Sequence, residues 1–294
     1  MSQRKADTII AIISISWGIS YIFMKVGLGG MGPFNMLALR FGIAFLVMFP
    51  LFFKRLTRPT AQTLACSLVA GTLLFSVFTA LLHGLQSTTA STSGFLTNTS
   101  VIFVPLLVAI KTRSLPQKQI VGAMILSLAG VYLLSGGDGV VMSGGALLVV
   151  LGAFFNGVYI FTTNQMAERV DTFQLGVYQL GIASTLGLAC SFIFEQPTLP
   201  HNQEQWIAVM GLALICSAFG FVMQPIAQRY TTPERTSILF GLDAVFSSIF
   251  AFILLAERFD MKGYIGAALV LSSVFISGMK TEKKIVKAAS CEVG

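Results

Sequence analysis

Long hydrophobic runs, each closed by a short polar or glycine-containing break, follow one another along almost the whole chain. A helix that crosses a bilayer needs about 20 mostly apolar residues, so each run predicts one transmembrane helix. The predicted helices cover residues 8–27, 34–53, 62–85, 88–110, 118–135, 144–165, 173–194, 206–228, 235–256 and 262–279. The pattern predicts an all-α integral membrane protein of ten transmembrane helices, without a separate soluble domain.

The hydrophobic pattern occurs twice. WGISYIF at 17–23 is matched by FNGVYIF at 155–161, and QIVGAMILSLAGVYLLSG at 119–136 by YIGAALVLSSVFISG at 264–278. Internal repeats in a membrane protein are typical of transporters. Because each copy holds an odd number of helices, the two copies cross the membrane in opposite directions. We expect two inverted five-helix repeats, 1–137 and 138–280, followed by a basic cytoplasmic tail at 281–294.

Composition and charge agree with this topology. Hydrophobic residues make up 55% of the chain and charged residues 11%, with a mean hydropathy of +0.81, which excludes an ordinary soluble protein. With a cytoplasmic N-terminus, the inner side collects all 19 Lys and Arg residues except Lys25, Arg40, Arg258 and Lys262. Positive charge concentrates in cytoplasmic segments, so we expect both termini inside. The net charge of +7 then requires no nucleic-acid partner.

The sequence lacks the motifs of an enzyme or of an ATP-driven pump. It has no G-x-x-x-x-G-K-[ST] loop and no H-E-x-x-H, and its four cysteines lack metal-binding spacing. GGDG at 136–139 is interpreted as a turn. STSG at 91–94 has no histidine on a plausible second helix. We expect no catalytic activity, no metal and no cofactor.

Two ionisable residues fall inside predicted helices, where a charge costs at least about 2.5–3.5 kcal/mol and usually faces a cavity or a partner. Arg40 lies in the second helix and Asp243 in the ninth, both toward the middle of the membrane. We hypothesise that they border one central cavity, where Asp243 binds a cationic group or a proton and Arg40 binds a carboxylate. The alternative is that neighbouring groups neutralise each charge, which then only stabilises the bundle.

Aromatic and amide residues extend this candidate site. Trp17 and Tyr21 match Phe155 and Tyr159 in the second copy, and their i, i+4 spacing puts each pair on one helix face. The two pairs are therefore expected to line opposite walls of one pocket, unless they are lipid-facing or core aromatics. Further polar candidates for the substrate path are Asn98, Asn156, Tyr178, Gln179 and Gln224.

Three residues are candidates for gating or hinge motion. His83 lies near the outer end of the third helix, where a plain interhelical hydrogen bond is the alternative role. Pro105 in the fourth helix and Pro225 in the eighth weaken their helices, as hinges or as static kinks. Small residues in the fifth and tenth helices predict close packing of these two helices on each other or in a homodimer.

Several motifs resemble the drug/metabolite transporter superfamily, specifically its EamA-domain members. They are SWG at 16–18, ALRFGIAF at 38–45, TTAS at 88–91, GFLT at 94–97, VPLL at 104–107 and LLAERFDMKGYIGAALVLSSVFIS at 254–277. The resemblance covers nearly the whole chain. Its most specific element is Glu257 followed nine residues later by Gly266, whereas Arg113 occupies the equivalent place before Gly122. We therefore interpret Glu257 as structural.

The resemblance implies a secondary transporter of the bacterial inner membrane. It would export amino acids, their analogues or other small amphipathic metabolites by alternating access. The expected partners are a small-molecule substrate and the lipid bilayer, with a homodimer as a possible assembly. The alternative is a membrane receptor or assembly subunit that keeps the fold without transporting anything.

Overall fold

Every regular element in the computed structural model is a helix, over the residues that it describes, 1–88, 90–134, 143–255 and 261–278. Eight helices in this part of the chain are long and apolar enough to cross a membrane, and each coincides with a predicted run. They are Gln3–Leu28, Pro33–Leu51, Ala61–Gln86, Thr92–Thr112, Gly144–Ala167, Thr172–Phe194, Gln203–Gln228 and Met261–Gly278. The predicted all-α membrane architecture is thus confirmed.

The other two predicted runs form shorter helices. Residues 118–135 correspond to α8, Lys118–Leu134, which has 17 residues, and residues 235–256 correspond to two helices in series, α13 and α14. The expected turn at 136–139, Glu257 and the basic tail lie outside the described residues.

Over the described residues of the first half, 1–88 and 90–134, the structure contains eight helices. They are α1 Gln3–Gly18, α2 Ser20–Leu28, α3 Pro33–Leu51, α4 Phe53–Leu56, α5 Ala61–Gln86, α6 Ala90–Asn98, α7 Ser100–Thr112 and α8. Local sequence determines several of their starts. Thr60 caps α5 by accepting a bond from the backbone N–H of Thr63, and Pro33 occupies the first turn of α3, where its missing N–H costs nothing.

The second half is built in the same way. It contains α9 Gly144–Ala167, α10 Thr172–Phe194, α11 Gln203–Gly211, the π-helix η1 Leu212–Phe219, α12 Gly220–Gln228, α13 Pro233–Phe240, α14 Leu242–Leu255 and α15 Met261–Gly278. Ser143, Asp171, Asn202 and Thr232 cap α9, α10, α11 and α13 through side-chain oxygens. These caps satisfy backbone donors that a helix start leaves free.

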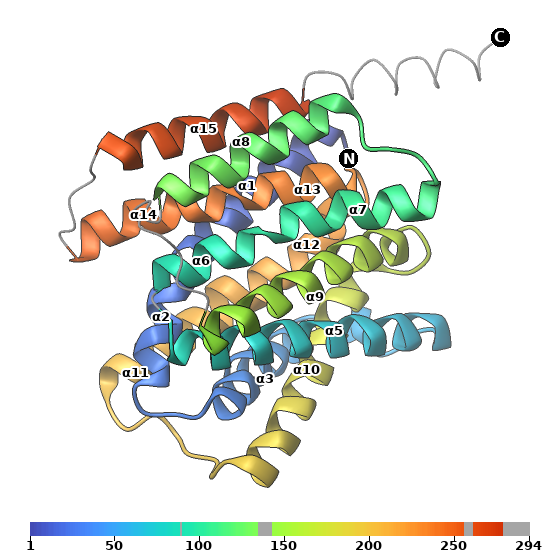
Figure 1. The fold of residues 1–294 in the computed structure, drawn as a ribbon. Helices are drawn as coiled ribbons and strands as arrows, with labels where there is room; N and C mark the ends of the chain where they lie inside the picture. Colours follow the sequence, from blue (N-terminus) through green and yellow to red (C-terminus); the bar gives the residue numbers. More distant parts are fainter. Residues whose placement is uncertain (89, 135–142, 256–260, 279–294) are drawn as a thin grey trace.

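Helices from the two halves pack against each other throughout the bundle (Figure 1). α3 lies along α10, α5 along α9, α8 along α15, and α1 beside α12 and α14. Small residues permit the closest approach, because a Cβ added at Gly130 in α8 would lie 2.6 Å from the carbonyl oxygen of Gly266 in α15. Gly130 and Gly266 thus lie where α8 and α15 come closest.

Three of the segments that cross the bundle are each broken into two consecutive helices. The breaks fall at Ile19 between α1 and α2, at Thr99 between α6 and α7, and at Gly241 between α13 and α14. Tighter bonds replace the α-helical ones at two of them, from Thr99 N to Leu96 O at 3.1 Å and from Gly241 N to Ile238 O at 3.0 Å. Broken helices at membrane depth occur where the backbone lines a cavity, so a functional site is expected where these breaks lie.

Candidate functional site

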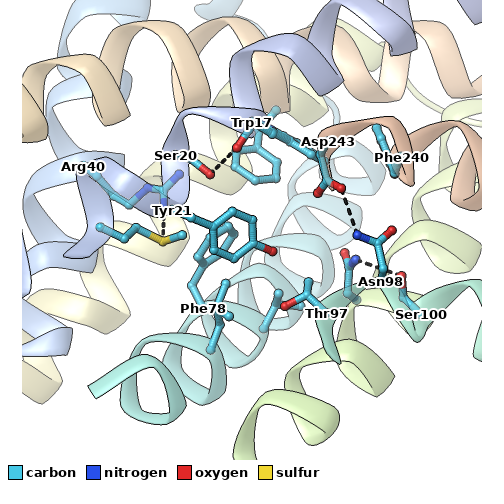
Figure 2. Close-up of a pocket in the computed structure, with 15 residues that line it drawn as sticks. Trp17, Ser20, Tyr21, Arg40, Phe78, Thr97, Asn98, Ser100, Phe240 and Asp243 are labelled. Atoms are coloured by element: carbon cyan, nitrogen blue, oxygen red, sulfur yellow. Dashed lines mark hydrogen bonds between the residues drawn. The ribbon is translucent and has the colours of Figure 1, made fainter. Parts of the chain in front are cut away.

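A buried cavity lies where the three broken segments meet (Figure 2). Each break supplies part of its lining: Trp17, Ser20 and Tyr21 from the first, Thr97, Asn98 and Ser100 from the second, and Phe240 and Asp243 from the third. The remaining lining residues are Met24, Arg40, Val77, Phe78, Leu81, Asn156 and Phe221. The cavity volume is about 50 Å³. A cavity needs at least about 10–15 Å³ of such space to hold one water, so this one has room for a few waters.

Asp243 supplies the negative charge of this cavity. Its side chain is 7% exposed, and the side-chain amide of Asn98 donates to its Oδ1 at 2.9 Å. Asp243 also lies in the first turn of α14, where the positive end of the helix dipole favours an anion. Within the described residues, no basic side chain forms an ion pair with this carboxylate. Neutral donors and the helix therefore hold Asp243.

Arg40 supplies the positive charge, from α3. Its side chain is 1% exposed, its Nε donates to Ser217 Oγ at 3.1 Å, and its Nη1 lies 3.5 Å from Met24 Sδ. The guanidinium carbon lies 4.4 Å from the ring centroid of Phe78, a cation–π distance. No carboxylate in the described part of the chain pairs with Arg40. A guanidinium has five N–H donors, so these contacts leave donors for a ligand.

Aromatic rings form the wall of the cavity. Figure 2 shows Tyr21 between Arg40 and Asp243 in that view. The Trp17 ring lies 4.7 Å from Phe240 and 4.9 Å from Phe221, between ring centroids. Its indole Nε1 donates to the carbonyl oxygen of Cys216 at 3.0 Å. Cys216 belongs to the π-helix η1, a type of local irregularity that is frequent at functional sites.

The structure brings together six of the residues proposed from the sequence: Trp17, Tyr21, Arg40, Asn98, Asn156 and Asp243. It places the other five elsewhere. Phe155 lines a second pocket, the Tyr178 hydroxyl donates to the carbonyl oxygen of Leu56, and Tyr159, Gln179 and Gln224 pack together between α9, α10 and α12. The pairs Trp17/Tyr21 and Phe155/Tyr159 consequently do not form opposite walls of the cavity.

The second pocket, of about 360 Å³, lies on the flank of α5 and α9. Its lining includes Phe34, Phe75, Phe155 and His83. His83 Nδ1 lies 2.8 Å from the carbonyl oxygen of Thr79 in its own helix, and its ring lies 4.9 Å from that of Phe34. The candidate gate His83 thus lies outside the central cavity, in a largely apolar pocket.

The two candidate hinge prolines lie inside their helices, Pro105 in α7 and Pro225 in α12. A proline has no N–H, which frees the carbonyl four residues earlier. For Pro225 this is the carbonyl of Phe221, and it accepts a bond from Gln179 Nε2 at 2.9 Å. Pro225 thereby creates the acceptor that binds α10 to α12.

The sequence did not single out nine of the lining residues: Ser20, Met24, Val77, Phe78, Leu81, Thr97, Ser100, Phe221 and Phe240. Ser20, Thr97 and Ser100 are polar neighbours of predicted residues, and this adjacency was a usable signal. The apolar lining residues carry no such signal in the sequence. Lipid is as apolar as the protein interior, so the lipid-facing and the cavity-facing sides of a helix look alike in sequence.

The described residues form helices with long apolar spans, which break around two buried charges that have no oppositely charged partner among these residues. These are features of a multi-pass membrane transporter. The EamA-like transporter family matches it over residues 4–136 and again over 143–279. The chain belongs to the EamA-like transporter family, and the resemblance noted in its sequence is confirmed.

Known relatives agree with this assignment. An uncharacterized transporter of Archaeoglobus fulgidus is 30% identical over 290 residues, which cover 95% of this chain and 99% of the relative. A probable terminal-alkyne amino-acid exporter of Streptantibioticus cattleyicolor is 25% identical over 291 residues, 96% of each chain. A crystal structure at 19% identity has the same fold, with a TM-score of 0.81 over 96% of this chain and 99% of that one.

Proposed function

We propose that this transporter exports small zwitterions, such as amino acids or their analogues, by alternating access. One observation carries the proposal: Arg40 and Asp243 line the same cavity, and within the described residues neither is matched by an opposite charge. A buried charge without a partner is costly, so a substrate that brings a carboxylate to Arg40 and an ammonium to Asp243 is strongly favoured.

The rest of the lining suits an amphipathic solute. Trp17, Phe78 and Phe240 offer aromatic surface to an apolar side chain, and Tyr21 adds a ring with a polar tip. The relative named as an amino-acid exporter supports the same class of substrate.

The small volume supports a cycle of conformations. At about 50 Å³ the cavity falls well below the roughly 300 Å³ at which ligand pockets begin. A substrate can therefore enter only after helices separate. The breaks at Ile19, Thr99 and Gly241 place weak points at the cavity where such a separation can begin.

We propose that ten transmembrane helices form two inverted repeats, 1–137 and 138–280, with a basic tail at 281–294. The two separate family matches support a duplication. Contacts between α3 and α10 support a twofold relation. A Cβ at Gly42, the tenth residue of α3, would meet Ser184, and one at Gly181, the tenth of α10, would meet Phe45. Ser184 and Phe45 are each the thirteenth residue, so the contacts are reciprocal, as a twofold axis requires.

The proposed orientation follows from charge. We propose that both termini are cytoplasmic, because the basic residues then concentrate inside. The family match favours the bacterial inner membrane as the location. Gly130 of α8 and Gly266 of α15 pack on each other, so these two residues are not free to form a homodimer contact.

Purified protein in sealed liposomes, offered a mixed pool of cell metabolites, tests the proposed function. We expect zwitterionic amino acids or analogues to cross faster than in protein-free liposomes, and faster than with the Asp243→Asn protein. If no solute crosses under any ion gradient or counter-solute, the protein is better explained as a receptor or assembly subunit with a transporter fold.

A further inference from the structure

A second group of polar side chains lies between α9, α10 and α12. We call Tyr159, Thr163, Gln179, Gln224 and Gln228 the inner cluster, because they lie in the halves of these helices that face the proposed cytoplasmic side. Each side chain in the cluster is at most 1% exposed. Amide and hydroxyl side chains inside a membrane protein must find hydrogen-bond partners across helices or contact water.

The inner cluster adjoins the central cavity through Phe221. The Tyr159 hydroxyl donates to Gln179 Oε1 at 3.0 Å and lies 3.5 Å from Gln224 Oε1. Gln179 Nε2 bonds the carbonyl oxygen of Phe221, whose ring lies 6.4 Å from that of Tyr159. Phe221 also lines the cavity, so one residue separates the two polar regions.

Several polar atoms of the inner cluster have no partner in the described structure. They are Gln224 Nε2, Gln228 Nε2 and Gln228 Oε1. Buried polar groups are nearly always hydrogen-bonded, and each exception calls for an explanation. Apolar residues would pack better at these positions, so the unpartnered amides are explained if water or a polar solute contacts them in another state of the protein.

The proposed inverted repeats indicate what this other state is. Tyr159 matches Tyr21, and Gln179 is the eighth residue of α10 as Arg40 is the eighth residue of α3. The inner cluster is thus the second copy's version of the cavity wall formed by Tyr21 and Arg40. In inverted-repeat transporters the two copies alternate in conformation, so a region that is packed in one state opens in the other.

We propose that the inner cluster is the cytoplasmic half of the substrate path, which opens when α12 separates from α9 and α10. The inference rests on the proposed transport function. In the open state the free amides of Gln224 and Gln228 face water and a passing polar solute. In the closed state the inner cluster is sealed, as the structure has it.

The surroundings of α12 fit a moving element. The π-helix η1 precedes it and Pro225 interrupts its hydrogen bonding, and both weaken the helix. At its cytoplasmic end, Asn164 Nδ2 donates to the carbonyl oxygens of Gln228 at 2.7 Å and Thr231 at 3.0 Å. These two bonds tie α12 to α9, and they must break for the path to open.

Cysteine accessibility tests the inner path. In a full-length protein with Cys66, Cys190, Cys216 and Cys291 replaced by Ala, Thr163→Cys and Gln179→Cys are exposed to a charged, membrane-impermeant methanethiosulfonate. The reagent is added to the cytoplasmic face of inverted vesicles. Thr162→Cys is the matched control, because Thr162 is the neighbour of Thr163 and its hydroxyl bonds Val158 O in its own helix. We expect both cluster cysteines to react about tenfold faster than the control, from the cytoplasmic face alone.

Thr163→Cys is nearly isosteric and keeps the test decisive if Gln179→Cys fails to fold. Reaction at the rate of the control, or only from the outer face, would overturn the inner path. Flux of radiolabelled amino acids through the same vesicles separates this result from the proposed function. Flux without cysteine labelling overturns the inner path alone, whereas labelling without flux supports the path's exposure to water and overturns transport of these substrates.

Discussion

Tyr21 and Arg40 in the first half of the chain occupy the positions that Tyr159 and Gln179 occupy in the second half, in the proposed repeats. The first pair faces a cavity, and the Arg40 guanidinium has no carboxylate partner among the described residues. The second pair is packed, and the neutral Gln179 amide bonds the carbonyl that Pro225 frees. Equivalent positions therefore share a geometry but differ in charge. We infer that the first half with Asp243 recognises the substrate, while the second half provides a neutral route.

The two halves also differ in helix continuity. α1 and α2 are separated at Ile19, whereas their counterpart α9 runs unbroken from Gly144 to Ala167. α5 is continuous from Ala61 to Gln86, whereas its counterpart contains the π-helix η1 between α11 and α12. Each half is thus irregular in one helix where the other is regular, which favours different motions on the two sides of the membrane.

Asp243→Asn removes a negative charge that has no counterpart in the first half. We expect this variant to have the largest effect on transport. Charge-assisted hydrogen bonds contribute about 1.5–3 kcal/mol, so transport of amine-bearing substrates should fall roughly tenfold or more. Folded yield should be unchanged, because an asparagine can still bond Asn98. Flux in liposomes at equal protein content measures the effect. Unchanged flux would assign Asp243 a structural role.

Arg40→Gln makes the first half resemble the second at the equivalent position. We expect the affinity for carboxylate-bearing substrates to fall about tenfold, with a smaller change for solutes that lack a carboxylate. Arg55→Gln is the matched control, since Arg55 is an exposed arginine that pairs with Asp171 far from the cavity. Competition of unlabelled solutes against a transported amino acid measures both. Equal losses in the two variants would contradict a specific role for Arg40.

Gly176→Ala tests the contact between α10 and α12 in the second half. The added Cβ would lie 2.8 Å from Val222 Cα, a backbone atom that cannot move away cheaply. We expect a loss of about 1–3 kcal/mol in the free energy of unfolding. Gly122→Ala in α8 is the control, because nothing lies within 4 Å of its added Cβ and alanine favours the helix by up to about 1 kcal/mol. Thermal unfolding in detergent should lower Tm for the first variant only.

Asp171→Asn, at the start of α10, has the smallest expected effect. Burial raises the pKa of Asp171, but the N–H groups of Gln174 and Phe173 and the Arg55 guanidinium outweigh it and hold the pKa below 3.8. Because the folded pKa is depressed, this stabilisation is present above the unfolded pKa and disappears as the pH falls through the folded pKa. The pair is exposed, so its contribution is at most about 1 kcal/mol.

Unfolding measured between neutral and acidic pH checks this prediction. Wild type and Asp171→Asn should differ in Tm at neutral pH and converge below the ordinary pKa of 3.8. A difference that stays constant across that range would show that the carboxylate charge contributes nothing.

The sequence predicted the helical spans well, because an apolar run of sufficient length has few alternatives to a membrane helix. It also identified Arg40 and Asp243, because an ionisable residue at such depth is costly wherever it points. It could not predict which faces of the helices meet. Phe155 was paired with Trp17 by repeat position, but Phe155 lines the second pocket, while Phe221 and Phe240 pack on Trp17. Neither the breaks at Thr99 and Gly241 nor the π-helix has a clear signal in the hydrophobic pattern.

Competition with three matched solutes tests the two-charge site most directly: a transported amino acid, its ester without a free carboxylate, and its deaminated acid. We expect the wild type to prefer the zwitterion. Arg40→Gln should lose the preference for the zwitterion over the ester, and Asp243→Asn should lose the preference for the zwitterion over the acid. If both variants weaken all three solutes equally, or neither alters the ranking, Arg40 and Asp243 do not form a zwitterion site.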